Sequence, residues 1–503
     1  SWSNLPLNES FATYGEYLWQ EYKYGRDAAD HHSAESRAGY FAESERKQTS
    51  LIRFQYNDKE DMFDAHSYNK GGQVLHMLRK YVGDDAFFAS LKLYLETNKF
   101  TSVEIHQLRL AFEKVTGEDL NWFFNQWFLG TGHPDLVIKT DYDPAAKKEI
   151  LQINQVQDFS KTSLFKIPMY VDIYAGGKVE RKKITLSKAE EVFEFPVDSK
   201  PDLVNVDAEK MLLCYKNEVK TVKELAYQYR NAPLYLDRYE AISKLLPRSS
   251  DSLAAVTIVS ALDDKFWGLR LDAIEGLKNI QPGHEKVIKE KLVELAKNDK
   301  KSLVRAIAIE YLSEHYKDNK DLQEVYKSGL NDRSYYVLSS SIGALAKLNP
   351  EEGIKVAKQY ETEKNTDVLY AVATIYAASG TDENNEFFLK NASKFTGFTM
   401  IGFVSEYGAF LKKVKKDETV NAGVALLEGI AKDKDISKWV AYYAKKSIKE
   451  LIVMYEDKIN FNTEKIKKLK EINPNADTRE QELQIESAKI QKEKVEKVFG
   501  TIK

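Results

Sequence analysis

The chain has 503 residues, which is too long for one hydrophobic core and suggests roughly three or four domains. Its 74 basic and 77 acidic side chains nearly balance, which argues against a nucleic-acid partner, since nucleic-acid-binding proteins usually carry a strong basic excess. No run of about 18 apolar residues is present, so no membrane span is expected, and the single cysteine, Cys214, excludes an intrachain disulfide and a cysteine-only metal site.

Residues 1–133 are expected to be mostly helical, because aromatic residues and leucines recur there at helical spacing. Asn4 or Asn8 is a suitable cap for the first helix, and the carboxylate of Glu9 would lie near the positive end of the helix dipole. The segment "DHHSAES" looks polar and loop-like. Adjacent histidine side chains diverge on regular structure, so His31 and His32 are expected to be solvated.

Residues 134–216 are predicted to form a small antiparallel β-sandwich. His133 and Pro134 end the helical pattern, and an alternation of apolar and polar residues follows around Val171. Gly176-Gly177 joins two such runs, which is typical of a tight hairpin.

Residues 217–455 are predicted to be α-helical repeats of the HEAT type. An apolar residue is followed four positions later by a small one, and this pattern recurs at spacings of 35, 33 and 32 residues. The positions are Leu269, Val304, Val337 and Leu369, with Ala273, Ala308, Ser341 and Ala373. Residues 456–503 are rich in Lys and Glu and are expected to form a charged, solvated helical segment.

Several kinds of catalytic site are absent from the sequence. There is no phosphate-binding glycine-rich loop and no GxSxG nucleophile elbow. His284 is followed by glutamate, but Ile288 occupies the position where a zinc-binding helix needs a second histidine. Two stretches remain, "LNESFATYGEYLW" and "AHSYNKGGQVLHML". Taken alone, they indicate a helix-end carboxylate at Glu9 and a packed aromatic residue at Tyr68.

Together, and in this order, the two stretches resemble motifs of the aminopeptidase N-like zinc metallopeptidases, a gluzincin family. The family's third zinc ligand lies in a motif of the form W-x-N-x-L-W-L-N-E-G-F-A, and "SWSNLPLNESFA" matches it in register, with Pro6 and Ser10 as departures. The family's Y-x-K-G-x-x-V-L-x-M-L motif is matched by Tyr68, Lys70, Gly71, Val74, Leu75, Met77 and Leu78.

This resemblance implies a multidomain α+β protein: the helical part of a thermolysin-like catalytic domain, then the sandwich and the repeats. It also implies one Zn²⁺ ion, with Glu9 as its third ligand and two histidine ligands outside this chain. Tyr68 would stabilise the tetrahedral intermediate during hydrolysis of N-terminal peptide bonds, so a peptide substrate is expected.

The zinc signature HExxH itself does not occur in the 503 residues. The resemblance places it before Ser1, so the chain is expected to be inactive without an N-terminal catalytic segment as its partner. Two alternatives stay open: a non-catalytic scaffold derived from the same family, and an epoxide-hydrolysing relative.

Overall fold

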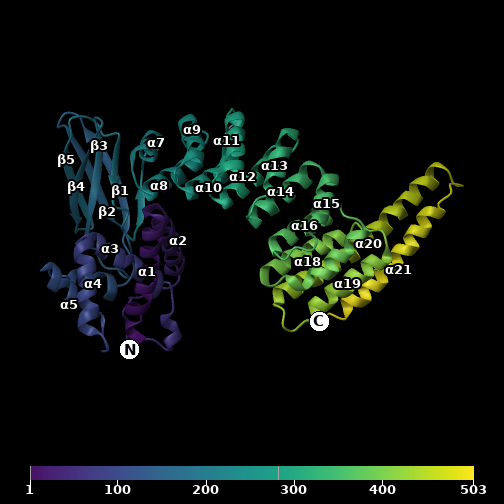
Figure 1. Ribbon diagram of the computed structural model, residues 1–503, viewed down its shortest axis with the longest axis horizontal. Helices are drawn as coiled ribbons and strands as arrows, with labels where there is room; N and C mark the ends of the chain where they lie inside the picture. The colour runs from purple at the N-terminus through teal and green to yellow at the C-terminus, as the bar shows by residue number, and fades with distance from the viewer. Residues whose placement is uncertain (1, 281–282, 503) are drawn as a thin grey trace. The chain divides into compact units, whose positions relative to one another are not determined.

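The computed structural model describes residues 2–280 and 283–502, which are mostly helical and include two small β-sheets (Figure 1). The chain divides into two compact units, residues 1–282 and residues 283–503. No described helix has the length and apolar character needed to cross a membrane. The predicted mixture of helices and small sheets is therefore confirmed.

Helices built around aromatic residues form the first part of unit 1. The chain turns from α1 into α2 at Gly25, whose φ of 87° is a conformation that suits glycine, and the two helices then lie side by side (Figure 1). Tyr14, Phe87 and Phe112 are buried in the shared core. The helices are α1 (Pro6–Tyr24), α2 (Arg26–Ser44), α3 (Gly71–Val82), α4 (Asp84–Asn98), α5 (Ile105–Thr116) and α6 (Asn121–Phe124).

Seven strands follow in two sheets, with the orders β5-β2-β1-β7 and β4-β3-β6. The expected hairpin joins β3 to β4 through Gly176 and Gly177, both with positive φ, and pairs Met169 with Ile184. The strands are β1 (Asp135–Asp143), β2 (Lys148–Gln155), β3 (Ile167–Ala175), β4 (Lys178–Leu186), β5 (Glu190–Pro196), β6 (Leu203–Val206) and β7 (Tyr215–Glu218).

One strand pair departs from the predicted antiparallel arrangement. Strand β7 runs parallel to β1, with Asp135 paired to Tyr215. A parallel pair cannot be joined by a tight hairpin. Here β7 follows β6, which belongs to the other sheet, so the chain reaches β1 by a crossover between sheets. The expectation of a purely antiparallel sandwich was therefore wrong at this edge.

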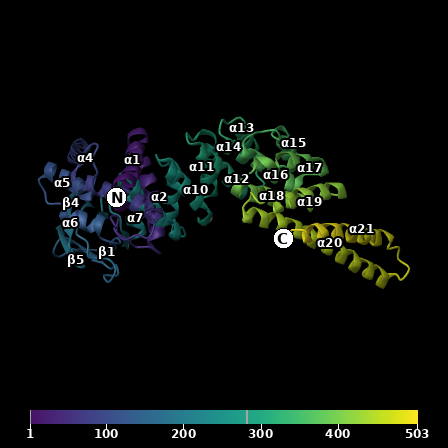
Figure 2. The same cartoon turned by 90° about the horizontal axis from the view of Figure 1, so that it is seen from below.

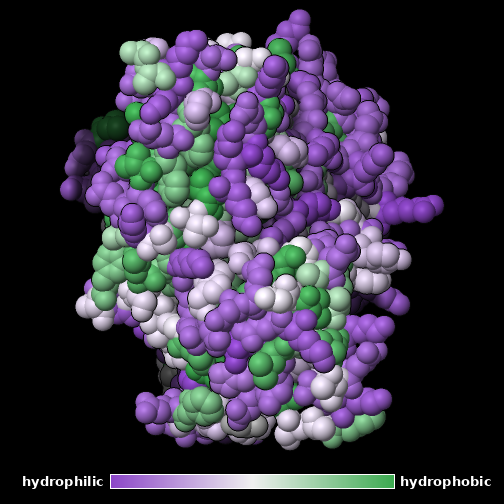
Figure 3. All heavy atoms as spheres, turned by 90° about the vertical axis from the view of Figure 1, so that its left-hand side faces the viewer, coloured by the Kyte–Doolittle hydropathy of each residue, from purple (hydrophilic) through white to green (hydrophobic). Residues whose placement is uncertain are grey.

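Both sheets contribute to one hydrophobic core with the preceding helices. Ile153 from the first sheet and Val171 from the second are buried in the same cluster as Trp127. The outer residues of β4 are mostly exposed and many are charged. Figure 3 shows the molecule from the side of the strands, where hydrophilic residues predominate and apolar side chains form small scattered groups.

Four helices complete unit 1 after the strands. Helix α7 begins with a capping box, in which Thr221 and Glu224 satisfy each other's backbone N–H groups. The helices are α7 (Val222–Asn231), α8 (Tyr235–Leu245), α9 (Ser252–Ser260) and α10 (Trp267–Gly276).

Unit 2 consists of helices in hairpins. Helices α12, α14, α16, α18 and α20 pack in this order as one layer, and the shorter helices between them flank it. The helices are α11 (Glu285–Asn298), α12 (Ser302–His315), α13 (Gln323–Gly329), α14 (Tyr335–Leu348), α15 (Pro350–Gln359), α16 (Thr366–Ser379), α17 (Asn385–Asn391), α18 (Gly397–Leu411), α19 (Asp417–Lys432), α20 (Lys438–Ile472) and α21 (Arg479–Gly500).

The eight positions of the sequence repeat are all buried, on α10 in unit 1 and on α12, α14 and α16 in unit 2. Small side chains at these positions allow close packing; the Cβ of an alanine at Gly329 would lie 2.0 Å from the Ser341 hydroxyl. Residue 456 lies within α20, which continues to Ile472 and lies beside α21 (Figure 2). The charged C-terminal residues thus belong to a long helical pair.

Candidate active site around Glu9 and Tyr68

Helix α1 begins without the side-chain cap that its sequence suggested. Pro6 is its first residue, a position where the ring suits the helical φ and the missing N–H costs nothing. Asn8 lies inside the helix, and the Oδ1 atom of Asn4 instead accepts a 3.0 Å hydrogen bond from Ile105 N at the start of α5. The predicted cap was therefore wrong, because the Asn4 side chain accepts from a backbone N–H group at the start of α5 and not from α1. Glu9 does lie in the first turn.

Tyr68 lies in a widened helical turn, the π-helical segment η3 (His66–Lys70) directly before α3. Ala65 O accepts hydrogen bonds from both Asn69 N at 3.0 Å and Lys70 N at 2.9 Å, so one residue is added to the turn. Such π turns inside helices are frequent at functional sites.

The start of α1 packs unusually close to η3 and α3. The Ser10 hydroxyl donates a 2.7 Å hydrogen bond to Ser67 O in the buried interface. A Cβ atom on Gly71 would lie 1.8 Å from Ser10 Oγ, and one on Gly72 would lie 3.0 Å from Thr13 Cγ2. The two glycines therefore permit an approach that larger residues would prevent. Ser10, which departs from the family motif, becomes part of this contact.

This packing brings Glu9 and Tyr68 together, although they are 59 positions apart in the sequence. Burial raises the pKa of Tyr68, and the hydrogen bond to Glu9 and the charge of Glu9 raise it further. The phenol is therefore protonated at neutral pH and can donate a hydrogen bond. Both side chains are half-buried. Glu9 forms no ion pair with any residue in the described ranges 2–280 and 283–502.

A carboxylate with these properties fits the requirement for a zinc ligand. Zinc accepts carboxylate oxygen among its ligands, and Glu9 combines a partly accessible carboxylate with freedom from any described cation. Its position in the first turn of α1 also holds the side chain near a fixed backbone.

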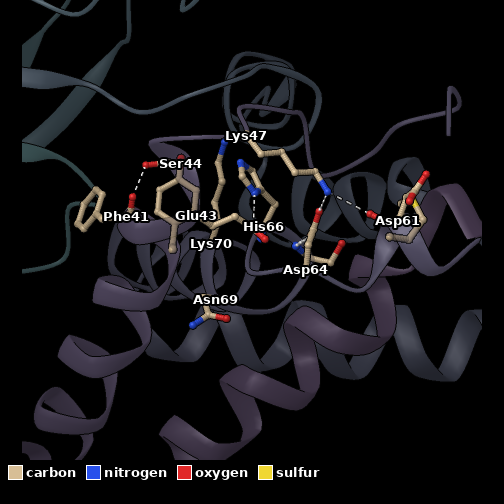
Figure 4. A network of polar contacts seen from close by, with 12 residues as sticks. Phe41, Glu43, Ser44, Lys47, Asp61, Asp64, His66, Asn69 and Lys70 are labelled. Carbon is tan, nitrogen blue, oxygen red and sulfur yellow. Dashed lines mark hydrogen bonds and ion pairs between the residues drawn. The ribbon is translucent and has the colours of Figure 1, made fainter. Parts of the chain in front are cut away.

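A second group with acidic side chains includes His66 of η3 (Figure 4). The ligand atoms of Glu43, Asp64 and His66 lie within 4.8 Å of one another, a spacing that could hold a metal ion. The Glu43 Oε2 atom lies 2.6 Å from His66 Nδ1, and it also accepts a 3.1 Å hydrogen bond from His66 N. Sequence reasoning missed this group because its members come from α2, a loop and η3.

Two cations already pair with Asp64 in this group. The Asp64 Oδ2 atom lies 2.6 Å from Lys47 Nζ and 2.7 Å from Arg53 Nη2. Burial alone would raise the pKa of Asp64, but hydrogen bonds from Lys47 and Ser67 and the charge of Arg53 hold it below its usual range. The two cations supply positive charge at Asp64, and this ion-pair network is joined to η3 by the hydrogen bond from Ser67 N to Asp64 Oδ1.

Lys70 forms a further buried link from η3 to the beginning of the strand region. Its Nζ atom donates a 2.8 Å hydrogen bond to Gly132 O and lies 5.8 Å from the centre of the Tyr40 ring. Burial lowers the pKa of Lys70 to about 7. The Tyr40 hydroxyl lies 2.9 Å from His133 Nδ1. Burial and then the charges of Lys70 and His66 lower the pKa of His133 to about 4.

The paired histidines His31 and His32 do not lie in a loop, as their polar surroundings suggested. Both lie within the continuous helix α2. His31 Nδ1 is 3.0 Å from the Tyr235 hydroxyl, and His32 Nε2 is 3.1 Å from Glu16 Oε2. The two histidines have different partners, as expected for neighbours on a helix, and the contact of His31 with Phe266 shows that His31 is partly packed rather than fully solvated.

Comparison with known proteins places these residues in a family. Residues 1–127 match the Peptidase family M1 domain. "Probable aminopeptidase 1" of Sulfurisphaera tokodaii is 22% identical over 406 residues, covering 76% of this chain and 46% of the relative. "Aminopeptidase M1" of Arabidopsis thaliana is 30% identical over 138 residues, covering 26% of this chain and 16% of the relative. The chain thus spans less than half the length of these relatives.

A solved structure extends the similarity to most of the fold. The crystal structure of Legionella pneumophila aminopeptidase A in complex with aspartic acid matches with a TM-score of 0.56 and 16% identity, covering 91% of this chain and 61% of that one. At this identity the match concerns the fold alone. Residues 1–127, which carry both Glu9 and Tyr68, match the Peptidase family M1 domain, and together with the aminopeptidase relatives this match supports an aminopeptidase N-like gluzincin family.

Proposed function

We propose that the protein is a zinc-dependent aminopeptidase and that this chain supplies one side of its active site. In this proposal Glu9 is the third zinc ligand and Tyr68 is a catalytic hydrogen-bond donor. The observation that carries the proposal is the convergence of a carboxylate and a protonated phenol from α1 and η3. The family relationship of residues 1–127 supports it.

Zinc, when bound, would polarise the scissile carbonyl and acidify the attacking water. The Glu9 carboxylate would contribute one oxygen to the metal. With that carboxylate engaged, the Tyr68 hydroxyl is free to donate to the substrate oxygen as it gains negative charge. The raised pKa of Tyr68 keeps the proton available for this bond. A single donor of this kind contributes about 3 kcal/mol to catalysis.

The rest of the chain would form the other domains of this protein and hold Tyr68 in position. We propose that residues 1–133 belong to a thermolysin-like catalytic domain, that 134–216 form the β-sandwich, and that 217–455 form HEAT-like repeats followed by the helical segment 456–503. The burial of all eight repeat positions supports the repeat assignment. The two buried links from η3, through Asp64 and Lys70, would hold Tyr68 in place.

Turnover of aminoacyl-arylamides tests this function. The chain alone should release no arylamine, whereas the protein that also contains the HExxH segment should release it in a zinc-dependent manner. Blocking the free amine by acetylation should abolish release, because an aminopeptidase acts at the N-terminus. Absence of turnover in the protein with an intact HExxH would contradict the proposal and favour the scaffold. Turnover of an epoxide without peptide hydrolysis would favour the epoxide-hydrolysing relative.

A further inference from the structure

A groove with a volume of about 820 Å³ crosses unit 2 over helices α12, α14, α16 and α18. This volume lies in the range of natural ligand sites. The neighbouring helices α14, α16 and α18 each contribute one aromatic side chain to its lining: Tyr336, Tyr370 and Phe398. Their exposed fractions are 58%, 38% and 88%, and each lies in the first two turns of its helix. The groove therefore has an exposed aromatic wall.

Small residues form the floor of this groove. Gly343 lies in the middle of α14, where glycine is unfavourable for the helix. A Cβ atom there would meet nothing within 4 Å, so no neighbouring side chain requires the glycine. At Gly402, by contrast, a Cβ atom would lie 2.8 Å from the Tyr370 ring, so this glycine lets the ring rest against α18. Gly343 leaves the floor open, and Gly402 positions the wall.

The charged residues that line the groove are three acids, Glu310, Glu314 and Asp367, and one base, Lys347. Lys347 pairs with Glu314 at 3.4 Å. Glu310 accepts a 2.7 Å hydrogen bond from the neutral Ser340 hydroxyl and forms no ion pair within the described part of the chain. Asp367 forms no ion pair with the residues that the structure describes. The groove thus presents negative charge beside aromatic rings.

We propose that this groove binds an extended cationic peptide segment of a partner protein. Arginine side chains suit it, because guanidinium groups stack on aromatic faces and pair with carboxylates. Tyr336, Tyr370 and Phe398 would hold the planar groups and side-chain stems, and Glu310 and Asp367 would pair with the charges. The small floor residues leave room for the peptide backbone. This binding is independent of the proposed peptidase activity and requires no catalysis.

Fluorescence anisotropy with the 503-residue chain tests the proposal directly. The probe is a labelled peptide of about eight residues in which arginine alternates with alanine, compared with the same peptide carrying glutamate in place of arginine. The arginine peptide should bind and the glutamate peptide should not. The double variant E310Q/D367N should weaken binding by about tenfold, as expected for the loss of two exposed charge pairs, and raising the salt concentration should weaken wild-type binding.

A glycine pair provides the matched steric control. Gly343→Phe should fill the groove and abolish binding, whereas Gly429→Phe should leave it unchanged, since Gly429 is an exposed glycine of α19 that also has open space at its Cβ position. Helical circular dichroism confirms folding of each variant. The proposal is overturned if the arginine peptide fails to bind at about millimolar concentration, if both peptides bind equally, or if E310Q/D367N and folded Gly343→Phe bind as the wild type does.

Discussion

At the scale of single residues, the decisive feature is that Tyr68 keeps its proton while facing Glu9. Burial, hydrogen bonding and the negative charge of Glu9 all raise its pKa, which favours the neutral phenol. A phenol in this state is a donor over the whole neutral range. Its proposed catalytic role depends on the hydroxyl alone and leaves the ring as a packing element.

Tyr68→Phe should therefore lower kcat by about 10²–10³-fold in the protein that contains the HExxH segment. The ring is retained and no zinc ligand is removed, so the zinc content should be unchanged. Tyr22→Phe is the matched control, because Tyr22 is 84% exposed on α1. Steady-state turnover with an aminoacyl-arylamide measures the effect. Near-wild-type kcat for Tyr68→Phe would remove Tyr68 from the mechanism.

Lys70 makes stability depend on pH in a predictable direction. Its pKa is lowered from 10.5 to about 7 by burial. Between these two values the unfolded chain binds more protons at this site than the folded chain, so its contribution to the free energy of unfolding rises with pH. The stabilisation is lost as the pH falls through about 7, where the buried amine becomes charged. Tyr40, His66 and His133 surround the amine and share this buried environment.

Lys70→Met should flatten this dependence. Urea unfolding at several pH values from about 7 to 10 should give a smaller rise in unfolding free energy for the variant than for the wild type. The control Lys99→Met removes an exposed lysine and should keep the wild-type slope. Equal slopes for all three proteins would show that Lys70 is not held neutral in the folded chain.

At the scale of helices, the contact between α1 and η3 determines where the two site residues lie. Ser10 and Gly71 form its tightest point, with a hydrogen bond on one side and no room for a Cβ atom on the other. Because the two segments are in direct contact, a shift of α1 would also shift η3. A change there should affect stability and alignment of the site together.

Gly71→Ala should destabilise unit 1 by about 1–3 kcal/mol, because the new Cβ atom overlaps Ser10 Oγ and Cβ. Ser10→Gly removes both atoms and should itself cost about 1 kcal/mol through the lost hydrogen bond. The double variant should recover part of the loss, giving a coupling free energy in the range of roughly 0.5–3 kcal/mol. Urea unfolding of the four proteins measures the cycle. Additive effects would mean that the two residues do not clash.

The features that could be predicted from the sequence are those that depend on residues close together in the chain. Helical periodicity and the Gly176-Gly177 hairpin depend on neighbouring residues, so both were found. Glu9 and Tyr68 were singled out through family motifs, and their roles stay a prediction. The bond from Ile105 N to Asn4 and the parallel pairing of β1 with β7 join distant segments, and no local pattern encodes them. The helical state of His31 was missed because the prediction relied on the polar residues around it. Its contact with Phe266, on a distant segment, is not visible in the local sequence.

At the scale of the whole molecule, each compact unit has its own kind of surface feature. Unit 1 holds the Glu9–Tyr68 pair and the buried links that support it. Unit 2 holds an acidic, aromatic-lined groove on its layer of helices. The Glu9–Tyr68 pair suits catalysis at a single peptide bond, and the groove suits binding of an extended peptide segment. In the proposed zinc site, two histidines of an HExxH segment would complete the ligand set, and Glu9 would be this chain's contribution to the metal.

The zinc content of Glu9→Gln and Glu16→Gln tests this account most directly. Both substitutions replace a glutamate of α1 by its neutral isostere, but only Glu9 faces Tyr68. In the protein that contains the HExxH segment, dialysis followed by elemental analysis should find about one zinc per chain in the wild type and in Glu16→Gln, as expected for a site with three protein ligands. Glu9→Gln should retain far less zinc. Full zinc occupancy in Glu9→Gln would contradict the assignment of Glu9 as a ligand and, with it, the proposed active site.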